Sequence, residues 1–429
     1  MYRDTGESAI THISWTALET NTHTMNTTST QLPAAKQPGL TTNNQHQILG
    51  KPVIEVDSRI LNLDSGFRHK FLCSGPTFTA GTACAYSCTY CFVEAQVGTK
   101  PFVTDVLGGQ AFQSVVIRRK NPVVTLKKEL FNARGEPKYK NATGVIYGSP
   151  LVDIAATKVL VQETIEIVHL LLDATGWDVR LLSKSPLIID IAKSLSPEQK
   201  KRVIFGLSTG SLDDAIARAI EPTCASPTKR TEALRWLQDN AYRTFAMLCP
   251  IPPQPMEQFM AKVLTDIRPG QCEHVWAEVI NLRKHSMTQT LAALEHAGLA
   301  KAAAELAAVS GQGSKPAWEM YARDTFRILA QHIPHNATAP KLRFLQYVTA
   351  ETKPWWNQQV SNGAIVLAPA QKKPTAPAVL PTTPIGGPAN PAPSLINVPK
   401  KAKDPMRVAA AHKAWATMRA KKADGGKKP

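Results

Sequence analysis

The sequence lacks any run of about 18 consecutive apolar residues, the length that predicts a membrane-spanning helix, so we expect none. Its first residues, MYRDTGESAI, have neither the basic start nor the apolar core of a secretory signal, which favours a cytoplasmic protein. Acidic residues are few: 33 Asp and Glu stand against 50 Lys and Arg, a net charge of +17. A positive excess of this size favours a polyanionic partner.

The overall composition excludes two further classes of protein. Of the 429 residues, 43% are hydrophobic and 19% are charged, which is ordinary for a globular protein and too apolar for a wholly disordered chain. The length allows a large core with appendages, which excludes a miniprotein framed by disulfides. The seven cysteines are therefore expected to be reduced thiols, or ligands of a metal or cluster.

The two ends of the chain differ from its middle. Residues 1–50 are rich in Thr, Asn, Gln and Ser and are predicted to be a disordered polar arm. Residues 361–399 are predicted to be an extended Pro- and Ala-rich linker, and residues 400–429 a basic tail. Residues 361–429 hold 12 Lys and Arg against two Asp, so +10 of the net charge lies there. Such a tail can contact a nucleic acid, with Trp415 stacking on a base, or simply keep the protein in solution.

The middle of the chain, residues 51–360, alternates strand-like and helix-like segments. This alternation predicts parallel strands joined by right-handed crossovers, and about six or seven units favour a partial or full barrel. In a barrel, the chemistry gathers at the carboxyl ends of the strands. Trp355 and Trp356 follow these units and are expected to close the core. The predicted strands are 70–72, 114–117, 144–147, 179–183, 203–208, 244–248 and 274–280, and the predicted helices are 124–132, 156–174, 186–194, 227–240 and 256–267.

Three cysteines lie close together in the segment GTACAYSCTYCFVEA. Cys84, Cys88 and Cys91 have the spacing C-x3-C-x2-C, which lets three thiolates converge on one metal centre. A structural zinc site needs a fourth ligand, and no second cysteine or histidine pair follows at a matching spacing. A cubane iron–sulfur cluster held by three cysteines leaves one iron open for a substrate or cofactor. A zinc site completed by Cys73, or three unligated thiols, are the alternatives.

The cysteine motif, with Tyr90 before its third cysteine and Phe92 after it, resembles the radical S-adenosylmethionine superfamily. The resemblance implies an α/β fold, a partial (β/α)6-type TIM barrel. It also implies that the three cysteines hold a 4Fe–4S cluster whose open iron chelates S-adenosylmethionine. An external one-electron reductant then drives cleavage of S-adenosylmethionine to a 5′-deoxyadenosyl radical, which abstracts a hydrogen atom from the substrate.

Downstream segments narrow the resemblance to the spore photoproduct lyase-like branch. The segments that carry it are IYGSPLVDIAATK, RLLSKSPLIIDIAK and VIFGLSTGSLDDAIARAIEPTCASPTKRTEALRWLQDNAYRTFAMLCPIP. The resemblance implies that Ser149, Lys184 and Ser208 bind S-adenosylmethionine. Each residue also has a simpler interpretation: a turn serine before a proline, a surface lysine, and a serine whose family counterpart aligns equally well with Gly206.

Other positions match the branch less closely. Glu278 aligns with a family glutamate and is expected to touch cofactor or substrate, or to pair with Arg283. Tyr147 replaces a cysteine that donates hydrogen in spore photoproduct lyase, and Phe92 replaces a tyrosine. Tyr147 is either a hydrogen relay or an ordinary core residue. Cys249 is either a substitute thiol donor or a buried, inert cysteine.

These features predict a radical S-adenosylmethionine enzyme acting on a nucleic acid, expected to be DNA, through a lyase-like or modification reaction. Because of Tyr147 and Phe92, only the radical-initiating half of the lyase reaction is expected to be intact. Two alternatives remain at this stage. The substrate could be a peptide or a small metabolite, or the protein could be a non-enzymatic, metal-bearing module that binds nucleic acid.

Overall fold

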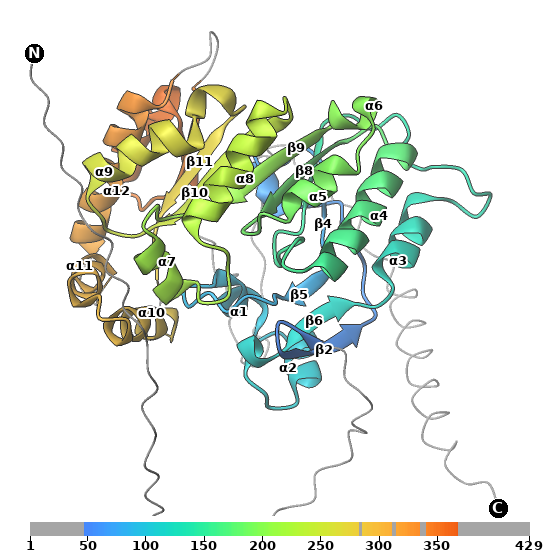
Figure 1. Cartoon of the computed structure of the whole chain (residues 1–429), viewed down its shortest axis with the longest axis horizontal. Helices are drawn as coiled ribbons and strands as arrows, with labels where there is room; N and C mark the ends of the chain where they lie inside the picture. The colour runs from blue at the N-terminus through green and yellow to red at the C-terminus, as the bar shows by residue number, and fades with distance from the viewer. Residues whose placement is uncertain (1–46, 283–284, 311–314, 335–339, 368–429) are drawn as a thin grey trace, which may run out of the picture. The chain divides into compact units, whose positions relative to one another are not determined.

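Nine strands form the main sheet, and all but one of its neighbouring pairs are parallel. The computed structural model describes residues 47–282, 285–310, 315–334 and 340–367. In this part the strand order is β13-β12-β11-β10-β9-β8-β7-β4-β3, and only β3 and β4 pair antiparallel (Figure 1). The strands are β3 (Leu61–Asn62), β4 (Thr77–Phe78), β7 (Val145–Gly148), β8 (Asp178–Ser183), β9 (Val203–Ser208), β10 (Arg243–Ile251), β11 (Val275–Val279), β12 (Leu342–Tyr347) and β13 (Ala364–Leu367).

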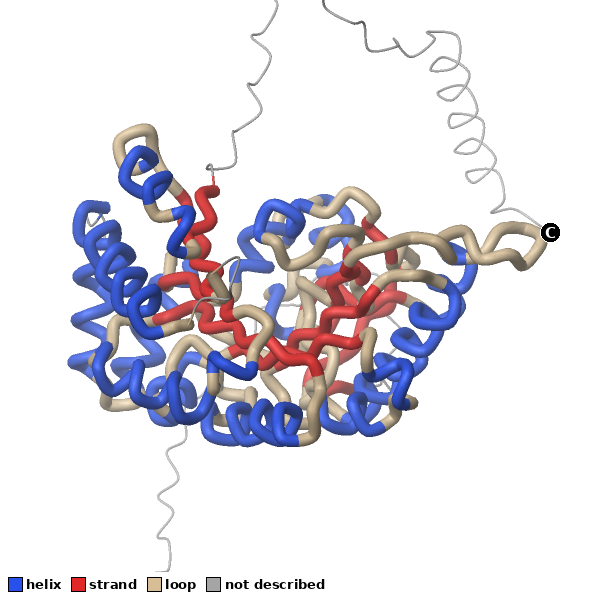
Figure 2. Tube along the Cα trace, turned by 90° about the horizontal axis from the view of Figure 1, so that it is seen from above, coloured by secondary structure: helices blue, strands red, loops and turns tan. Residues whose placement is uncertain are grey.

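Helices connect the parallel strands along the outer side of the curved sheet (Figure 2). One of these connecting helices, α4 (Lys158–Ala174), buries an apolar stripe that includes Ile167, Val168 and Leu171. Thr157 caps its start by accepting the Leu160 N–H. The other helices on this side are α3 (Pro122–Leu130), α5 (Ile188–Lys193), α6 (Pro197–Lys200), α7 (Asp214–Ile220), α8 (Pro227–Asp239), α9 (Met256–Lys262) with the π-helical turn η3 (Val263–Ile267), the 3-10 turn η4 (Pro269–Gln271) and α12 (Lys315–His332).

The inner face of the sheet is lined by every second residue of the strands. Register pairs Tyr147 with Arg180 on the neighbouring strand, and Met247 with Trp276. Successive side chains of a strand point to opposite faces, so these residues share one face. The buried residues of this face are Leu72, Cys73, Tyr147, Ile204, Phe245, Met247, Trp276, Leu345, Ile365 and Leu367.

A second, four-stranded sheet carries the cysteine segment. Its order is β1-β2-β6-β5, with β2 and β6 parallel and the outer pairs antiparallel. The cysteine loop runs from the end of β5 to the start of α1. The elements are β1 (Gln47–Ile48), β2 (Lys51–Val56), β5 (Gly81–Ala83), α1 (Phe92–Val97), α2 (Pro101–Leu107), the 3-10 turn η2 (Phe112–Ser114) and β6 (Val116–Arg119).

Two predicted strands are corrected by the structure. Residues 66–70 form the 3-10 helix η1 (Gly66–Lys70), so the strand predicted over 70–72 is wrong. Ser65 caps this helix, and Phe71 ends it in a left-handed conformation with φ of 56°. The strand predicted over 114–117 exists as β6, shifted by two residues, but it belongs to the second sheet and not to the main one.

The predicted ends of the core are also corrected. Gln47–Ile48 form β1 inside the range predicted as the polar arm, because they pair with β2. Ala364–Leu367 form β13 inside the predicted linker, because this apolar segment pairs with β12. Residues 1–46 of the arm, residues 368–399 of the linker and the basic tail lie outside the described residues, as does the whole of the second unit of the chain, Gln371–Pro429.

Helices near the carboxyl end complete the described structure. Trp356 is fully buried, and its ring stacks on that of Phe344 with 5.6 Å between the ring centroids. The ring of Trp355 packs edge-on against the ring of Trp356. Both tryptophans therefore close the core as predicted. Within the described residues no helix is long and apolar enough to cross a membrane. The remaining helices are α10 (His285–His296), α11 (Ala300–Ser310), α13 (Lys353–Gln358) and the 3-10 turn η5 (Val360–Asn362).

Candidate active site

The three cysteines of the motif lie on one short loop. Cys84 directly follows β5, and Cys91 is the residue that precedes the first turn of α1. The Cys91 N–H donates to the Cys88 carbonyl at 3.2 Å, which curls the loop back on itself. The Cys84 sulfur accepts backbone N–H groups of Tyr86 at 3.4 Å and Asp153 at 3.3 Å. Hydrogen bonds of this kind are typical of sulfurs that hold an iron–sulfur cluster.

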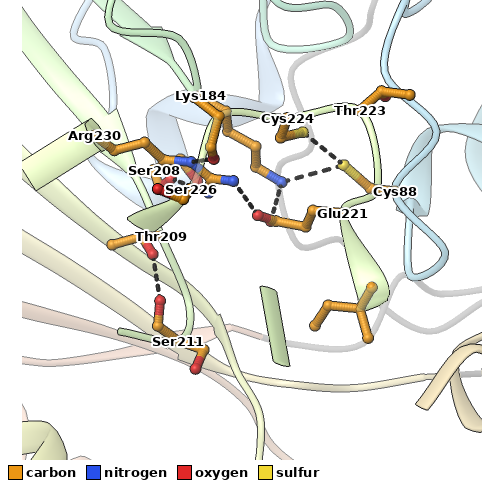
Figure 3. Close-up of polar contacts among 12 residues, drawn as sticks. Cys88, Lys184, Ser208, Thr209, Ser211, Glu221, Thr223, Cys224, Ser226 and Arg230 are labelled. Carbon is orange, nitrogen blue, oxygen red and sulfur yellow. Dashed lines mark hydrogen bonds and ion pairs between the residues drawn. The ribbon is translucent and has the colours of Figure 1, made fainter. Parts of the chain in front are cut away.

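A second loop, between α7 and α8, is bonded to the cysteine loop. The Thr89 N–H donates to the Ile220 carbonyl at 2.9 Å, and the Ser87 N–H donates to the Thr223 hydroxyl at 3.1 Å. These bonds bring the Cys224 sulfur to 3.7 Å from the Cys88 sulfur (Figure 3). The extra cysteine beside the motif is therefore Cys224. Cys73, the residue considered as a fourth zinc ligand, belongs to the inner-face core.

Lys184 links the end of β8 to the cysteine loop. Its ammonium nitrogen lies 3.5 Å from the Cys88 sulfur and 2.7 Å from a Glu221 carboxylate oxygen (Figure 3). It also donates to the Tyr90 hydroxyl. Only 15% of its side chain is exposed, so the simpler interpretation as a solvated surface lysine is wrong.

Glu221 neutralises two buried cations at this site. Its carboxylate pairs with Lys184 and with Arg230, which is 1% exposed and also donates to the Ser208 carbonyl at 2.9 Å. Burial by itself raises the pKa of Glu221, but the two cations outweigh burial and lower the pKa to about 2. Glu221 is therefore ionised at neutral pH. Its charge holds Lys184 and Arg230 in place.

The electrostatic surroundings differ between the three thiols. Burial and the Asp153 carboxylate raise the pKa of Cys84 to about 12, and burial raises that of Cys91. The hydrogen bond with Cys224, with help from Lys184, lowers the pKa of Cys88 to about 7. A metal must therefore displace protons to bind here, as metals do at thiol sites.

A second lysine, Lys51 at the start of β2, interacts electrostatically with all three motif cysteines. Two lysines beside three thiols would offset the negative charge of a cluster and its thiolate ligands. The donor set therefore fits a 4Fe–4S cluster. In the described part of the chain no three His, Cys, Asp or Glu side chains lie close enough together to hold a single metal ion. A cubane differs from a single ion, because each cysteine binds a different iron and the thiolates stand farther apart.

Ser149 follows β7 and carries an unused hydroxyl. Ser149 is buried and has a left-handed backbone conformation with φ of 46°. Its hydroxyl has no hydrogen-bond partner among the described residues. Ser149 and Cys84 line the same small cavity. A buried hydroxyl without a partner is costly, so its presence beside the cysteine loop points to a ligand that completes it.

Asp153 ties the Ser149 loop to the end of β8. Its carboxylate accepts the Lys184 backbone N–H at 2.7 Å and the Ser183 hydroxyl at 2.8 Å. Because the Asp153 N–H donates to Cys84, one residue sets the position of Lys184 relative to the cysteine loop.

Ser208 ends β9, and its hydroxyl donates to the Cys249 carbonyl at 3.3 Å. The alternative position, Gly206, has no room for a side chain, because a Cβ atom there would lie 2.3 Å from the Phe245 ring. Ser208 is therefore the one of the two that can hold a side chain without displacing the core.

This crowding gives a stability prediction. Gly206→Ala should destabilise the protein by about 1–3 kcal/mol, because the added methyl overpacks against Phe245. Gly66→Ala is the matched control, since a Cβ at Gly66 meets no atom within 4 Å. Chemical denaturation measures both. Equal stability of the two variants would contradict the packing described for β9.

The inner face brings the remaining predicted residues together. The Cys249 sulfur lies 3.8 Å from a Glu278 carboxylate oxygen, and the Lys70 ammonium lies 3.9 Å from the same oxygen. Burial raises the pKa of Glu278. The proposed partner of Glu278, Arg283, lies outside the described residues. Tyr147 is buried on the same face and interacts electrostatically with Cys249.

Sequence reasoning missed five residues of the site. Glu221 and Arg230 lie within the segment that carries the family resemblance, in EPTCASPTKR, so a buried acid–base pair could have been sought there. Cys224 lies in the same segment and Asp153 in IYGSPLVDIAATK, but their contacts, like those of Lys51, are with residues distant in the sequence.

Comparison with solved structures finds several structures of spore photoproduct lyase. A tyrosine-to-phenylalanine mutant of spore photoproduct lyase is 13% identical, with a TM-score of 0.44, and the match covers 69% of this chain and 82% of that one. The chain is similar to spore photoproduct lyase. The lyase complexed with dinucleoside spore photoproduct is 13% identical, with a TM-score of 0.42 and coverage of 68% and 81%.

A double mutant of spore photoproduct lyase with bound AdoMet and dinucleoside spore photoproduct is 12% identical, with a TM-score of 0.44 and coverage of 69% and 82%. No family model matches the chain. No curated protein matches it either.

Proposed function

We propose that the chain is a radical S-adenosylmethionine enzyme whose cluster is held by Cys84, Cys88 and Cys91. The observation that carries the proposal is the meeting of this cysteine loop with buried Lys184 at the carboxyl end of a parallel strand. Parallel sheets place their chemistry at this edge. The curved sheet then corresponds to the partial barrel of the superfamily. Reductive cleavage of S-adenosylmethionine by the reconstituted chain tests the proposal.

When bound, a 4Fe–4S cluster and S-adenosylmethionine supply a 5′-deoxyadenosyl radical for hydrogen abstraction. The residues of the chain position and shield that chemistry. Lys184 offers an ammonium group to the carboxylate of S-adenosylmethionine, and its partner Glu221 fixes its direction. Ser149 offers its unpaired hydroxyl, and Ser208 a further hydroxyl at the end of β9. Glu278 faces the inner side of the sheet, where it can touch cofactor or substrate.

Hydrogen return to the product is assigned to Cys249 or Tyr147. Both lie on the inner face, and Cys249 interacts electrostatically with Lys184, which connects this face to the cysteine loop. An S–H bond and a phenolic O–H bond are both weaker than an alkyl C–H bond, so either group can return a hydrogen atom to a carbon radical. Position 92 holds a phenylalanine, which is 55% exposed and has no hydroxyl hydrogen to donate. We therefore assign the return of the hydrogen atom to Cys249 or Tyr147.

The Lys184 role gives a binding prediction. Lys184→Met should weaken S-adenosylmethionine binding by about 10- to 150-fold. This range corresponds to the loss of one charge-assisted hydrogen bond, which contributes about 1.5–3 kcal/mol. Titration of the reconstituted protein with S-adenosylmethionine measures it. The iron content should stay that of the native protein, since Lys184 is no cluster ligand. Lys193→Met, at the exposed end of α5, is the control. Unchanged affinity in the Lys184 variant would remove it from the cofactor site.

A nucleic acid, with DNA preferred, is the proposed substrate class. Support comes from the sequence resemblance and from the excess of Lys and Arg in residues 361–429. The test compares DNA binding of the full chain with that of a chain ending at residue 370, which keeps β13 intact. Loss of a salt-dependent interaction in the shorter chain supports delivery by the tail. No DNA binding by the full chain at low salt would favour a peptide or small-metabolite substrate.

A further inference from the structure

The structure places a fourth thiol against the cysteine loop. The sulfurs of Cys88 and Cys224 are 3.7 Å apart, which is van der Waals contact for two sulfur atoms. Figure 3 shows the two side chains pointing toward each other from different loops. A disulfide requires the sulfurs to approach to about 2.05 Å, a short further movement.

Backbone bonds on both sides of the pair hold the two loops in register. The residue before Cys88 donates its N–H to the hydroxyl of Thr223 at 3.1 Å, and the residue after it donates to the carbonyl of Ile220 at 2.9 Å. The contact between the sulfurs is therefore built into the packing of the loops. It does not depend on a single flexible side chain.

The two thiols differ in how they can be reached. Cys88 is 8% exposed, whereas Cys224 lines a cavity of about 700 Å³ that is open to the surface. Charged residues of both signs line this cavity, Arg218 and Lys229 together with Asp214, Glu221 and Glu232. Because Cys224 lines the cavity and Cys88 is buried, a small disulfide such as oxidised glutathione can meet Cys224 first and Cys88 second.

We propose that Cys88 and Cys224 form a reversible disulfide in the metal-free chain, so that oxidation blocks loading of the cluster. The Cys224 thiol gives up its proton to water, and its sulfur attacks oxidised glutathione, forming a mixed disulfide and releasing one glutathione thiolate. The Cys88 thiolate then attacks the Cys224 sulfur and expels the second glutathione thiolate. The two protein protons pass through water to the released thiolates. In balance, two protein thiols are oxidised and one oxidised glutathione is reduced to two glutathione molecules.

The consequence rests on the proposed function, because Cys88 is one of the three proposed cluster ligands. Bound in a disulfide, it cannot bind iron, and two cysteines remain on the loop. Conversely, a cluster that is already bound through Cys88 would protect this sulfur from disulfide formation. The pair would therefore restrict cluster loading to reducing conditions.

The experiment maps disulfides in the full-length, metal-free chain after incubation with oxidised glutathione. Chymotrypsin cleaves after Tyr86 and Tyr90 and so isolates Cys88 from Cys84 and Cys91, while trypsin places Cys224 alone in AIEPTCASPTK. We expect a linked peptide joining Cys88 to Cys224 as the main product. Links within the motif as the main product, or no link at all, would overturn the proposal.

Iron loading provides the second readout. Oxidised native protein should take up about tenfold less iron than the reduced protein, and dithiothreitol should restore the uptake. Oxidised Cys224→Ala should load as fully as its reduced form, whereas Cys272→Ala, which removes a cysteine from the main core, should behave as native protein. Loss of loading in oxidised Cys224→Ala would overturn the proposal. If no variant binds iron while the Cys88–Cys224 link forms, the proposed function fails and the disulfide stands.

Discussion

The Cys88→Ala variant is expected to lose its iron and to cleave no S-adenosylmethionine above the rate of the metal-free protein. Cys88 is the middle cysteine of the motif, and it is the one that lies beside Lys184 and the loop of Cys224. Removing it leaves two thiolates, which cannot hold a cubane with a single open iron. Iron and sulfide analysis after anaerobic reconstitution measures the loss. Cys84→Ala and Cys91→Ala should behave in the same way.

Cys272→Ala is the matched control for this prediction. Cys272 is buried in the main core, where it interacts with Gln238, and has no contact with the cysteine loop among the described residues. It should therefore keep the iron content and the cleavage rate of the native protein, even though it loses some stability. A Cys88 variant that keeps its full iron would show that the cluster is held elsewhere.

Replacing Glu221 by glutamine should destabilise the fold by about 3–5 kcal/mol. The Glu221 carboxylate is 4% exposed and carries the charge that balances Lys184 and Arg230. Glutamine keeps the size but leaves two buried cations without their anion. Chemical denaturation measures the difference in unfolding free energy. Glu232→Gln, at an exposed position of α8, should change stability by less than about 0.5 kcal/mol.

The pH dependence of the same comparison follows from the lowered pKa of Glu221. The folded-state pKa of about 2 lies below the ordinary value of 4.5, so the carboxylate stabilises the fold above about pH 4.5. That contribution is lost as the pH falls from about 4.5 toward 2. The stability gap between native protein and Glu221→Gln should therefore be smaller at about pH 3 than at about pH 7. A gap that grows on acidification would contradict the ion-pair assignment.

Parallel strands of the main sheet were predictable from the sequence where they are long and apolar. The segment VIFGLS forms β9 with the predicted bounds, because it is a buried run between polar segments. The strand predicted over 70–72 was wrong because this segment is too short for a pattern of two- or four-residue spacing to identify its conformation. Its conformation depends on tertiary contacts, such as the hydrogen bond from the Arg180 guanidinium to the Leu72 carbonyl at 2.6 Å.

The candidate site was predictable only as far as its motifs reach. The cysteine spacing is local, so Cys84, Cys88 and Cys91 could be named directly. Glu221 and Cys224 lie within a segment that carries the family resemblance, but their partners Lys184 and Cys88 lie on other loops, so the contacts could not be read from the sequence. These contacts can be recognised only in the folded structure, where the ends of β8 and β9 and the cysteine loop lie at one edge of the sheet.

The most direct test of the central claim is the conversion of S-adenosylmethionine to 5′-deoxyadenosine and methionine by the anaerobically reconstituted, reduced protein. Native protein with a full cluster is compared with Cys88→Ala under the same conditions. We predict that the native protein forms both products in equal amounts and that the variant forms neither. Native protein that holds a full 4Fe–4S cluster, binds S-adenosylmethionine and yet leaves it intact under reduction would contradict the account.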